Sequence, residues 1–120
     1  MVKDFSPSLD RVFHALAHPA RRAMLRRLAE GERNLSELAA PLRMSFPAAS
    51  KHVRVLERAR LVRRRVAGRV HLVRIEPKPL AKANEWLEDY RRFWEQSFER
   101  LDELLGEIQG QEKTRRDTEK

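Results

Sequence analysis

The sequence predicts a mainly α-helical fold that carries one two-stranded β-hairpin. Apolar residues recur at helical spacing along most of the chain, helix-start signals separate the first four segments, and one β-branched segment with a glycine interrupts the helices. The 120 residues suffice for one modest core. No apolar run approaches the roughly 18 to 20 residues of a membrane span, and residues 1–10 lack the apolar core of a secretion signal, so we expect a cytoplasmic protein without membrane contact.

Two helices are expected before residue 31. The first has an apolar stripe at positions i, i+3, i+4 and i+7, formed by Leu9, Val12, Phe13 and Leu16. Pro19 suits the first position of a second helix, which we expect to end at Gly31. Its inward residues are Met24, Leu25 and Leu28.

A helix-turn-helix follows from the next two start signals. Asn34 and Glu37 have the spacing of a capping box and begin a third helix, and Ser45 is a good N-cap for a fourth helix over residues 46–59. The inward residues of the third helix are Leu35, Leu38, Ala39 and Leu42. Only Arg43 and Met44 separate the two helices, and two short helices joined by so tight a turn form a helix-turn-helix.

The fourth helix has two chemically different faces. At 100° per residue, Ala49, Val53 and Leu56 share one side, and the opposite side carries Pro47, Lys51, Arg54 and Arg58. Ser50 and Val55 flank the basic face, where a hydroxyl and a methyl group suit contacts to DNA. A helix held by its apolar side with cations outward has the layout needed to enter a major groove. His52 lies nearer the core side, where packing or a phosphate contact and a titrating switch are the two alternatives.

Residues 61–77 predict the β-hairpin. Alternation places Val62, Arg64 and Val66 on one face, and Arg63 and Arg65 on the other. In the return strand the residues that share a face are His71, Val73 and Ile75. Gly68 supplies the positive φ that the tip requires. A hairpin edged with arginine directly after a recognition helix is a wing, whose long cationic side chains reach phosphates or a minor groove.

The positive charge is concentrated in this region. The formal net charge is +8, and residues 51–75 alone hold nine Lys or Arg and one acidic residue. The remaining residues balance, so the cluster indicates a polyanionic partner. A solvated basic face without a partner is the alternative.

Residues 79–109 predict one long helix. A seam steps by three and four residues through Leu80, Ala83, Leu87, Tyr90, Trp94, Ser97, Leu101, Leu104 and Ile108. Trp86 and Phe93 add a second stripe, and a helix about 45 Å long is too long to bury both stripes on so small a core. A second subunit is the expected partner, and a monomer whose aromatic residues cap the core is the alternative. The organisation is a 1–7 extension, an 8–77 core, a 78–109 dimerisation helix and a 110–120 disordered tail.

Several ordered motifs resemble one family. The stretch from HALAHPARR to LVRRRVAGR, with MSFPAASKHVRVLE inside it and WLEDYRRFWEQSFERLDELL after it, is similar to the ArsR (arsenical-resistance-repressor) family of winged helix-turn-helix regulators, in its metal-free branch. The resemblance implies four helices, a wing and a fifth helix, an operator in double-stranded DNA with two-fold symmetry, and a homodimer formed through the first and last helices. The implied DNA contacts are Ser45, Pro47, Ala48, Ser50, Lys51, His52, Arg54, Arg65 and Arg69. The expected dimer contacts are Leu9, Val12, Phe13, Leu87, Tyr90, Trp94 and Leu101.

Two departures from the family concern turns. Arg43 and Arg60 stand where many relatives have glycine, so these turns are expected to be tight or strained. The chain has no cysteine, and residues 78–109 have no histidine, so the resemblance brings no metal or other cofactor with it. Asp10, His14 and His18, at spacing i, i+4, i+8, are the one alternative ligand set, with unliganded surface histidines as the simpler interpretation.

Three classes of function are compatible with the fold. A sequence-specific DNA-binding repressor is preferred, and a less specific architectural or RNA-binding winged-helix protein is the alternative. A hydrolytic enzyme is not expected, because the sequence has no nucleophile motif such as GxSxG and no glycine-rich phosphate loop. The sequence identifies neither the operator nor the effector that would release it.

Overall fold

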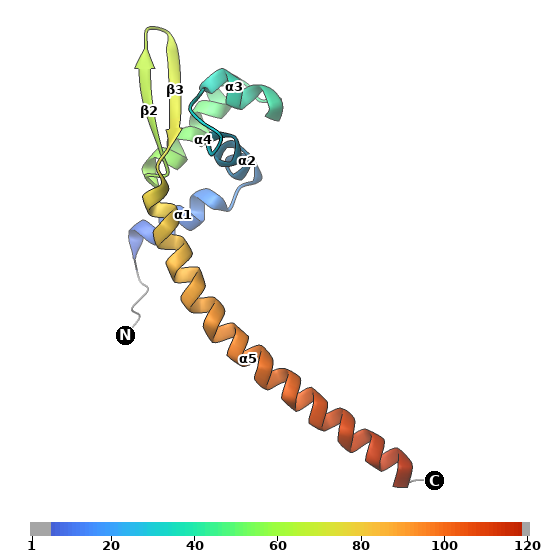
Figure 1. The fold of residues 1–120 in the computed structure, drawn as a ribbon. Helices are drawn as coiled ribbons and strands as arrows, with labels where there is room; N and C mark the ends of the chain where they lie inside the picture. The colour runs from blue at the N-terminus through green and yellow to red at the C-terminus, as the bar shows by residue number, and fades with distance from the viewer. Residues whose placement is uncertain (1–5, 119–120) are drawn as a thin grey trace. The chain divides into compact units, whose positions relative to one another are not determined.

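A computed structural model describes the backbone of residues 6–118 and the side chains of residues 6–112. It divides into two units, a winged unit (residues 6–84 of the described chain) and a helix unit (residues 85–118). Figure 1 shows the order of the elements, and each unit is described separately below. The elements of the winged unit are α1 (Pro7–Leu16), α2 (Pro19–Leu28), β1 (Arg33–Asn34), α3 (Leu35–Ala39), η1 (Ala40–Leu42), α4 (Phe46–Arg58), β2 (Val62–Ala67) and β3 (Val70–Ile75).

Side-chain caps start the helices where the sequence predicts. The Ser6 hydroxyl accepts a hydrogen bond from the Leu9 amide at the start of α1, and the Ser45 hydroxyl accepts one from Ala48 at the start of α4. At α3 the capping box is complete, because Asn34 and Glu37 each accept the other's backbone N–H. These caps satisfy amides that the helices themselves leave unpaired.

The turn between α3 and α4 contains a left-handed residue. The single 3₁₀ turn η1 is followed by Arg43, whose φ is 54°, and α4 begins three residues later at Phe46. Arg60, directly after α4, has φ 60°. Both arginines therefore occupy the conformation that favours glycine, as expected from the family's glycines at these positions.

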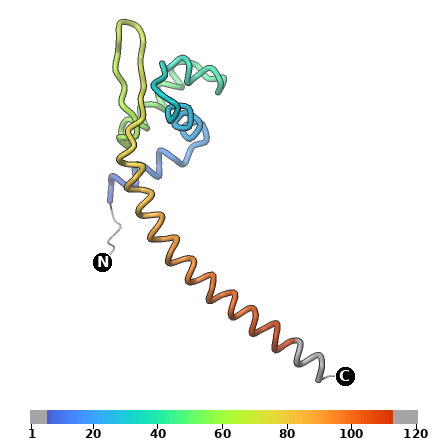
Figure 2. Tube along the Cα trace, viewed as in Figure 1, coloured from blue at the N-terminus to red at the C-terminus, as the bar shows by residue number. Residues whose placement is uncertain are grey.

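The wing belongs to a three-stranded antiparallel sheet of order β1-β3-β2. Val62 pairs with Ile75 and Val66 with His71, which gives the predicted faces, and Gly68 turns the tip with φ 63°. In Figure 2 the hairpin projects beyond the helices at this tip. The sequence did not predict β1, where Arg33 pairs with Val73. A strand of two residues has no periodicity to detect.

One core holds the winged unit together. Its largest fully buried side chains are Met24, Leu28, Leu35, Leu38, Leu56, Leu61, Val53 and Val73. They come from α2, α3, α4 and β3, and from Leu61 directly before β2. Several are predicted inward residues of the second, third and fourth helices; of the other predicted inward residues, Leu25, Ala39 and Ala49 are also buried, and Leu42 is half-buried. The apolar side of α4 is thus fixed against the core, which turns its basic side outward.

The fifth helix, α5 (Pro77–Thr118), is longer than predicted. It continues past Gln109, so the expected disordered tail over residues 110–120 is wrong up to Thr118, and residues 119–120 lie outside the described chain. The segment after Gln109 is polar, but Gln, Glu, Lys and Arg are good helix formers, and polarity alone does not end a helix. At the other end, α1 includes Pro7, which was assigned to the extension, and residues 1–5 lie outside the described chain.

Within the described residues, no helix combines the length with the continuous apolar sequence required to span a bilayer. The long α5 has charged side chains along its whole length.

Candidate nucleic-acid interface

The basic face of α4 is exposed, as the helical spacing predicts. Lys51, Arg54 and Arg58 are exposed, whereas Ala49 and Val53 on the opposite side have no exposed surface. The first turn presents a small surface made of Ser45, Pro47 and Ala48, of which the first two are exposed and the third is half-buried. Of the contacts predicted here, Ser45, Pro47, Lys51 and Arg54 are thus exposed, and Ala48, Ser50 and His52 are half-buried.

The wing carries the two predicted arginines in different surroundings. Arg69 is exposed beside Gly68 at the tip. Arg65 is also exposed, but its guanidinium lies 3.1 Å from a carboxylate oxygen of Glu32. An exposed ion pair of this kind stabilises a protein by about 1 kcal/mol at most, so Arg65 can exchange Glu32 for a phosphate at low cost.

Ion pairs divide the nine cations of residues 51–75 into two groups. Four of them pair with a carboxylate: Arg63 and Arg74 with Glu76, Arg64 with Glu57, and Arg65 with Glu32. The other five have no carboxylate partner among the described residues, namely Lys51, Arg54, Arg58, Arg60 and Arg69. These five lie on α4, directly after it, and at the wing tip. Uncompensated cations gathered on two adjoining elements are an electrostatic footprint for phosphates.

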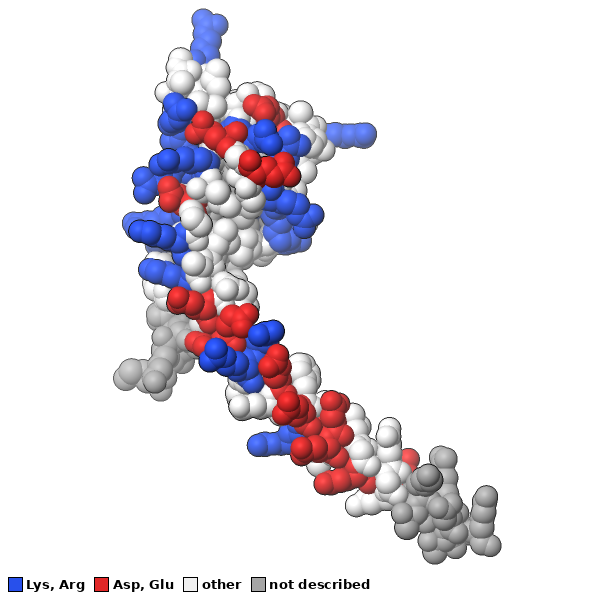
Figure 3. Space-filling view, viewed as in Figure 1, with Lys and Arg blue, Asp and Glu red and all other residues white. Residues whose placement is uncertain are grey.

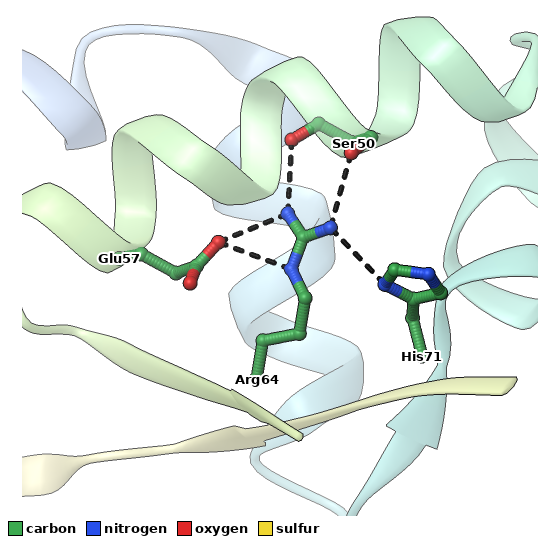
Figure 4. Close-up of polar contacts among 4 residues, drawn as sticks. All are labelled: Ser50, Glu57, Arg64 and His71. Carbon is green, nitrogen blue, oxygen red and sulfur yellow. Dashed lines mark hydrogen bonds and ion pairs between the residues drawn. The ribbon is translucent and has the colours of Figure 1, made fainter. Parts of the chain in front are cut away.

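Ser50 is held from inside the protein. Its hydroxyl oxygen accepts a hydrogen bond from Nη1 of Arg64 at 3.1 Å, and its carbonyl accepts one from Nη2 at 3.2 Å. Figure 4 shows Arg64 reaching from β2 to α4. The sequence contains a signal for this contact, because strand alternation places Arg64 on the same face as Val62 and Val66.

His52 is oriented by a buried arginine. Arg21 of α2 is 8% exposed, and its Nε and Nη2 donate to the carbonyls of Ala15 and His14, where α1 ends. Its Nη1 lies 3.3 Å from Nδ1 of His52. Because arginine only donates, Nδ1 of His52 accepts, and the ring's remaining N–H at Nε2 is available to an acceptor outside.

The same surroundings lower the pKa of His52 below its usual value of 6.5. Burial is the largest cause, followed by the charges of His18, Arg21 and Lys51. The ring of His18 packs against that of His52 with centroids 4.5 Å apart. The neutral imidazole is thus the favoured form, which suits a packed hydrogen-bond acceptor.

The Asp10, His14 and His18 set does not lie on one helix. α1 ends at Leu16, and His18 caps α2 by accepting the Ala20 amide at Nδ1. Within the described part of the chain, no three His, Cys, Asp or Glu side chains are grouped so that they could hold a metal ion.

The predicted dimer residues of α1 and those of the helix unit differ in how exposed their side chains are. Leu9 and Phe13 of α1 are half-buried against the core, whereas Val12 is 3% exposed. Val12 packs inside its own subunit and is therefore removed from the predicted interface. In the helix unit all four predicted residues are exposed, between 41% and 49%: Leu87, Tyr90, Trp94 and Leu101.

The apolar face of the helix unit is wider than the predicted seam. Phe98 and Leu105 are 56% and 47% exposed and lie one residue after seam positions. Ser97, the polar seam residue, donates its hydroxyl to the Phe93 carbonyl within the same helix. Three apolar positions per heptad are typical of a helix that packs against more than one neighbour.

Comparisons with known proteins identify this arrangement. A helix-turn-helix domain model matches residues 16–65. Over 87 residues the chain is 44% identical to the HTH-type transcriptional regulator Rv2034 of Mycobacterium tuberculosis, an alignment that covers 72% of this chain and 78% of that protein. The crystal structure of an ArsR family transcriptional regulator, RHA00566, is 40% identical, with 73% of this chain and 91% of that chain covered and a TM-score of 0.69.

The chain belongs to the ArsR family of transcriptional regulators. An ArsR-like regulator from Rhodococcus sp. RHA1 is 28% identical over 81% of this chain and 92% of its own, with a TM-score of 0.64. The homodimeric winged helix-turn-helix DNA-binding domain of Mb0332 from Mycobacterium bovis is also 28% identical, over 71% and 79% of the two chains, with a TM-score of 0.57. This ArsR-family protein is thus a DNA-binding winged helix-turn-helix regulator, and the predicted fold class is confirmed.

Proposed function

We propose that this ArsR-family protein is a homodimeric repressor that binds an inverted-repeat operator in double-stranded DNA and has no catalytic activity. The observation that carries the proposal is the set of five exposed cations on α4, after it and at the wing tip that have no carboxylate partner among the described residues. These five are available to phosphates without breaking an ion pair, whereas Arg65 must first release Glu32.

The helix unit supports the homodimer. Nine large apolar side chains there are roughly half exposed: Leu87, Tyr90, Phe93, Trp94, Phe98, Leu101, Leu104, Leu105 and Ile108. Together they offer on the order of 900 Å², close to the roughly 800 Å² that each partner buries in a stable interface. The similar domain of Mb0332 is homodimeric.

A two-fold dimer determines the form of the operator. Each recognition helix contacts one half-site, so the half-sites are inverted and about 10 base pairs apart, or a multiple of that spacing. The second helix then binds at high effective concentration, which raises the affinity far above that of a single helix.

The first experiment selects binding sites from random duplexes and then competes the selected site with scrambled DNA and with RNA in gel shifts. We expect an inverted repeat and competition by the selected duplex alone. Equal competition by scrambled DNA or RNA would favour the architectural or RNA-binding alternative. Transcription from a promoter that carries the site should fall when the protein is added, and a rise would contradict repression.

Base contacts can be tested on the same duplex. Lys51→Ala and Arg54→Ala should each weaken binding by about 1 to 3 kcal/mol on the selected site and by less on scrambled DNA. Arg26→Ala removes an exposed arginine from α2, outside the proposed interface, and is the matched control. Equal losses on both duplexes would show that α4 does not contact bases as proposed.

A further inference from the structure

Arg64 is the most fully bonded cation of the wing. Its side chain is 13% exposed and extends from β2 to α4 and β3 (Figure 4). Nε donates to a carboxylate oxygen of Glu57 at 3.1 Å, and Nη2 lies 2.9 Å from the same oxygen in an ion pair and donates to the Ser50 carbonyl. Nη1 donates to the Ser50 hydroxyl and lies 3.4 Å from Nδ1 of His71.

These contacts engage all three nitrogens of the side chain. A guanidinium carries its N–H groups on three nitrogens, and in the structure each of these nitrogens is hydrogen-bonded to an acceptor inside the protein, with an additional ion pair to Glu57. Arg64 is therefore directed into the protein rather than toward a phosphate, and its charge is balanced by Glu57. Its role differs from that of Arg65 and Arg69 on the same hairpin.

The acceptors lie on three elements. Ser50 and Glu57 are two helical turns apart on α4, and His71 belongs to β3. A planar group that bonds the helix at two separated points resists both sliding and rotation of the hairpin along α4. Such a fork is geometrically specific, because its bonds form only at one orientation.

The bond to Ser50 also acts on a predicted DNA contact. A hydroxyl has two acceptor positions and one donor. Because Arg64 occupies an acceptor position of the Ser50 hydroxyl, the hydrogen of that hydroxyl points elsewhere and remains available to a phosphate or base oxygen.

We propose that Arg64 is a positioning residue that locks the wing to the recognition helix, so that the base contacts of α4 and the phosphate contact of Arg69 form in one fixed geometry. The inference rests on the proposed DNA binding. It predicts that the contribution of Arg69 to the free energy of DNA binding depends on Arg64, although the two side chains have different roles.

A double-mutant cycle tests this dependence with a duplex that the wild-type protein selects from a random library. Dissociation constants are measured by fluorescence anisotropy at several salt concentrations for the wild type, Arg64→Met, Arg69→Ala and the double variant. In the wild-type background Arg69→Ala should weaken binding roughly five- to tenfold and flatten the salt slope by about one. In the Arg64→Met background the same change should weaken binding by about twofold or less.

Two further variants separate geometry from charge. Arg63→Met is the matched control, because Arg63 precedes Arg64 on β2 but pairs with Glu76, and the Arg69→Ala effect should keep its full size there. Arg64→Lys keeps the positive charge and the aliphatic part of the side chain but lacks the planar guanidinium. In this background, as in Arg64→Met, Arg69→Ala should weaken DNA binding by about twofold or less. Arg64→Lys also replaces Arg64→Met in the test if that variant fails to fold.

Each outcome decides the inference. If Arg69→Ala weakens DNA binding as much in the Arg64→Met or Arg64→Lys background as in the wild type, the inference is overturned. It is also overturned if the effect of Arg69→Ala shrinks as much in the Arg63→Met background as in the Arg64→Met background. If the wild-type protein selects no duplex, the proposed function fails first and the inference falls with it. Selection of a duplex followed by additive losses refutes only the role of Arg64.

Discussion

The winged unit and the helix unit are built on opposite principles. Among the side chains that the structure describes, the winged unit contains all sixteen buried hydrophobic residues, whereas nine of the twelve exposed large hydrophobic residues lie in the helix unit. Charge divides in the same way. Residues 1–84 hold nineteen basic and seven acidic side chains, a net charge of +12, and residues 85–120 hold seven and eleven, a net charge of −4. Figure 3 shows blue side chains gathered over the winged unit and red ones along the helix unit.

This division separates two tasks. The winged unit buries its own apolar residues, so its surface is free for cations that attract a polyanion. The helix unit leaves its apolar residues exposed, and an isolated helix has little stability without tertiary packing. We therefore expect it to pack against a protein partner, and its net negative charge disfavours phosphate binding. The predictions below test whether the two units are as independent as this contrast implies.

The largest effect is expected from truncating a leucine in the winged unit. Leu38 has no exposed surface, so Leu38→Ala should lower the free energy of unfolding by about 2 to 5 kcal/mol. The matched variant Leu104→Ala removes the same atoms from a half-exposed position in the helix unit. Urea titrations at several protein concentrations should show a loss at every concentration for Leu38→Ala, and for Leu104→Ala a loss that depends on concentration. Identical behaviour of the two variants would contradict the contrast between the units.

The second effect concerns the partner of the helix unit. Leu101→Glu places a charge on the apolar face and should produce a monomer, with affinity for the selected duplex reduced about 100-fold. Gln96→Glu adds the same charge on the opposite side of the helix and should leave both properties unchanged. Sedimentation and gel shifts on the same samples measure both. A Leu101→Glu monomer that binds with full affinity would refute the dimer mechanism, and a Leu101→Glu dimer would move the interface elsewhere.

The features of the fold that the sequence predicted correctly depend on residues close together in the chain. The caps at Asn34 and Ser45 depend on residues three apart, and the apolar side of α4 depends on a period within one helix, so short-range rules found them. The pairing of β1 with β3 joins residues about forty apart, and no local pattern marks it.

The roles of Arg21 and Arg64 in the candidate interface were not predicted from the sequence. The second helix contains four arginines, of which only Arg21 is buried: it donates to the carbonyls of Ala15 and His14, whereas Arg22 donates to the Leu16 carbonyl and stays exposed. Charge counting treated Arg64 as part of the basic surface, although Glu57 neutralises it. In both cases the role of the side chain follows from acceptors on another element, which a linear sequence does not specify.

A smaller effect compares the turns of one unit with the helix of the other. Arg43 and Arg60 adopt positive φ, whereas Gly106 is helical and its missing side chain would meet nothing within 4 Å. Left-handed conformations cost most residues about 1 to 2 kcal/mol, and glycine in a helix costs about 0.5 to 1 kcal/mol. Arg43→Gly, Arg60→Gly and Gly106→Ala should therefore each raise the free energy of unfolding by up to about 1 kcal/mol. If Arg43→Gly or Arg60→Gly lowers the free energy of unfolding instead, the arginine that was replaced makes a contact that compensates for its backbone conformation.

The smallest effect is a pH dependence that belongs to the winged unit alone. All four histidines lie in this unit, and the pKa of His52 is lowered, first by burial and then by His18, Arg21 and Lys51. Below the usual value of 6.5 the unfolded chain therefore binds a proton that the folded chain resists. The free energy of unfolding should fall as the pH decreases below 6.5, until the folded state is protonated as well.

Urea titrations between pH 8 and pH 5 test this sign on the wild type, on His52→Asn and on His14→Asn, which replaces an exposed histidine. The His52→Asn curve should depend less on pH, because the group that binds the extra proton on unfolding is gone, whereas His14→Asn should follow the wild type. The dimer dissociation constant should stay constant over this range, since the helix unit has no histidine. A His52→Asn curve parallel to that of the wild type would exclude His52 as the source, and a dimer that weakens over the same range would show that the two units are coupled.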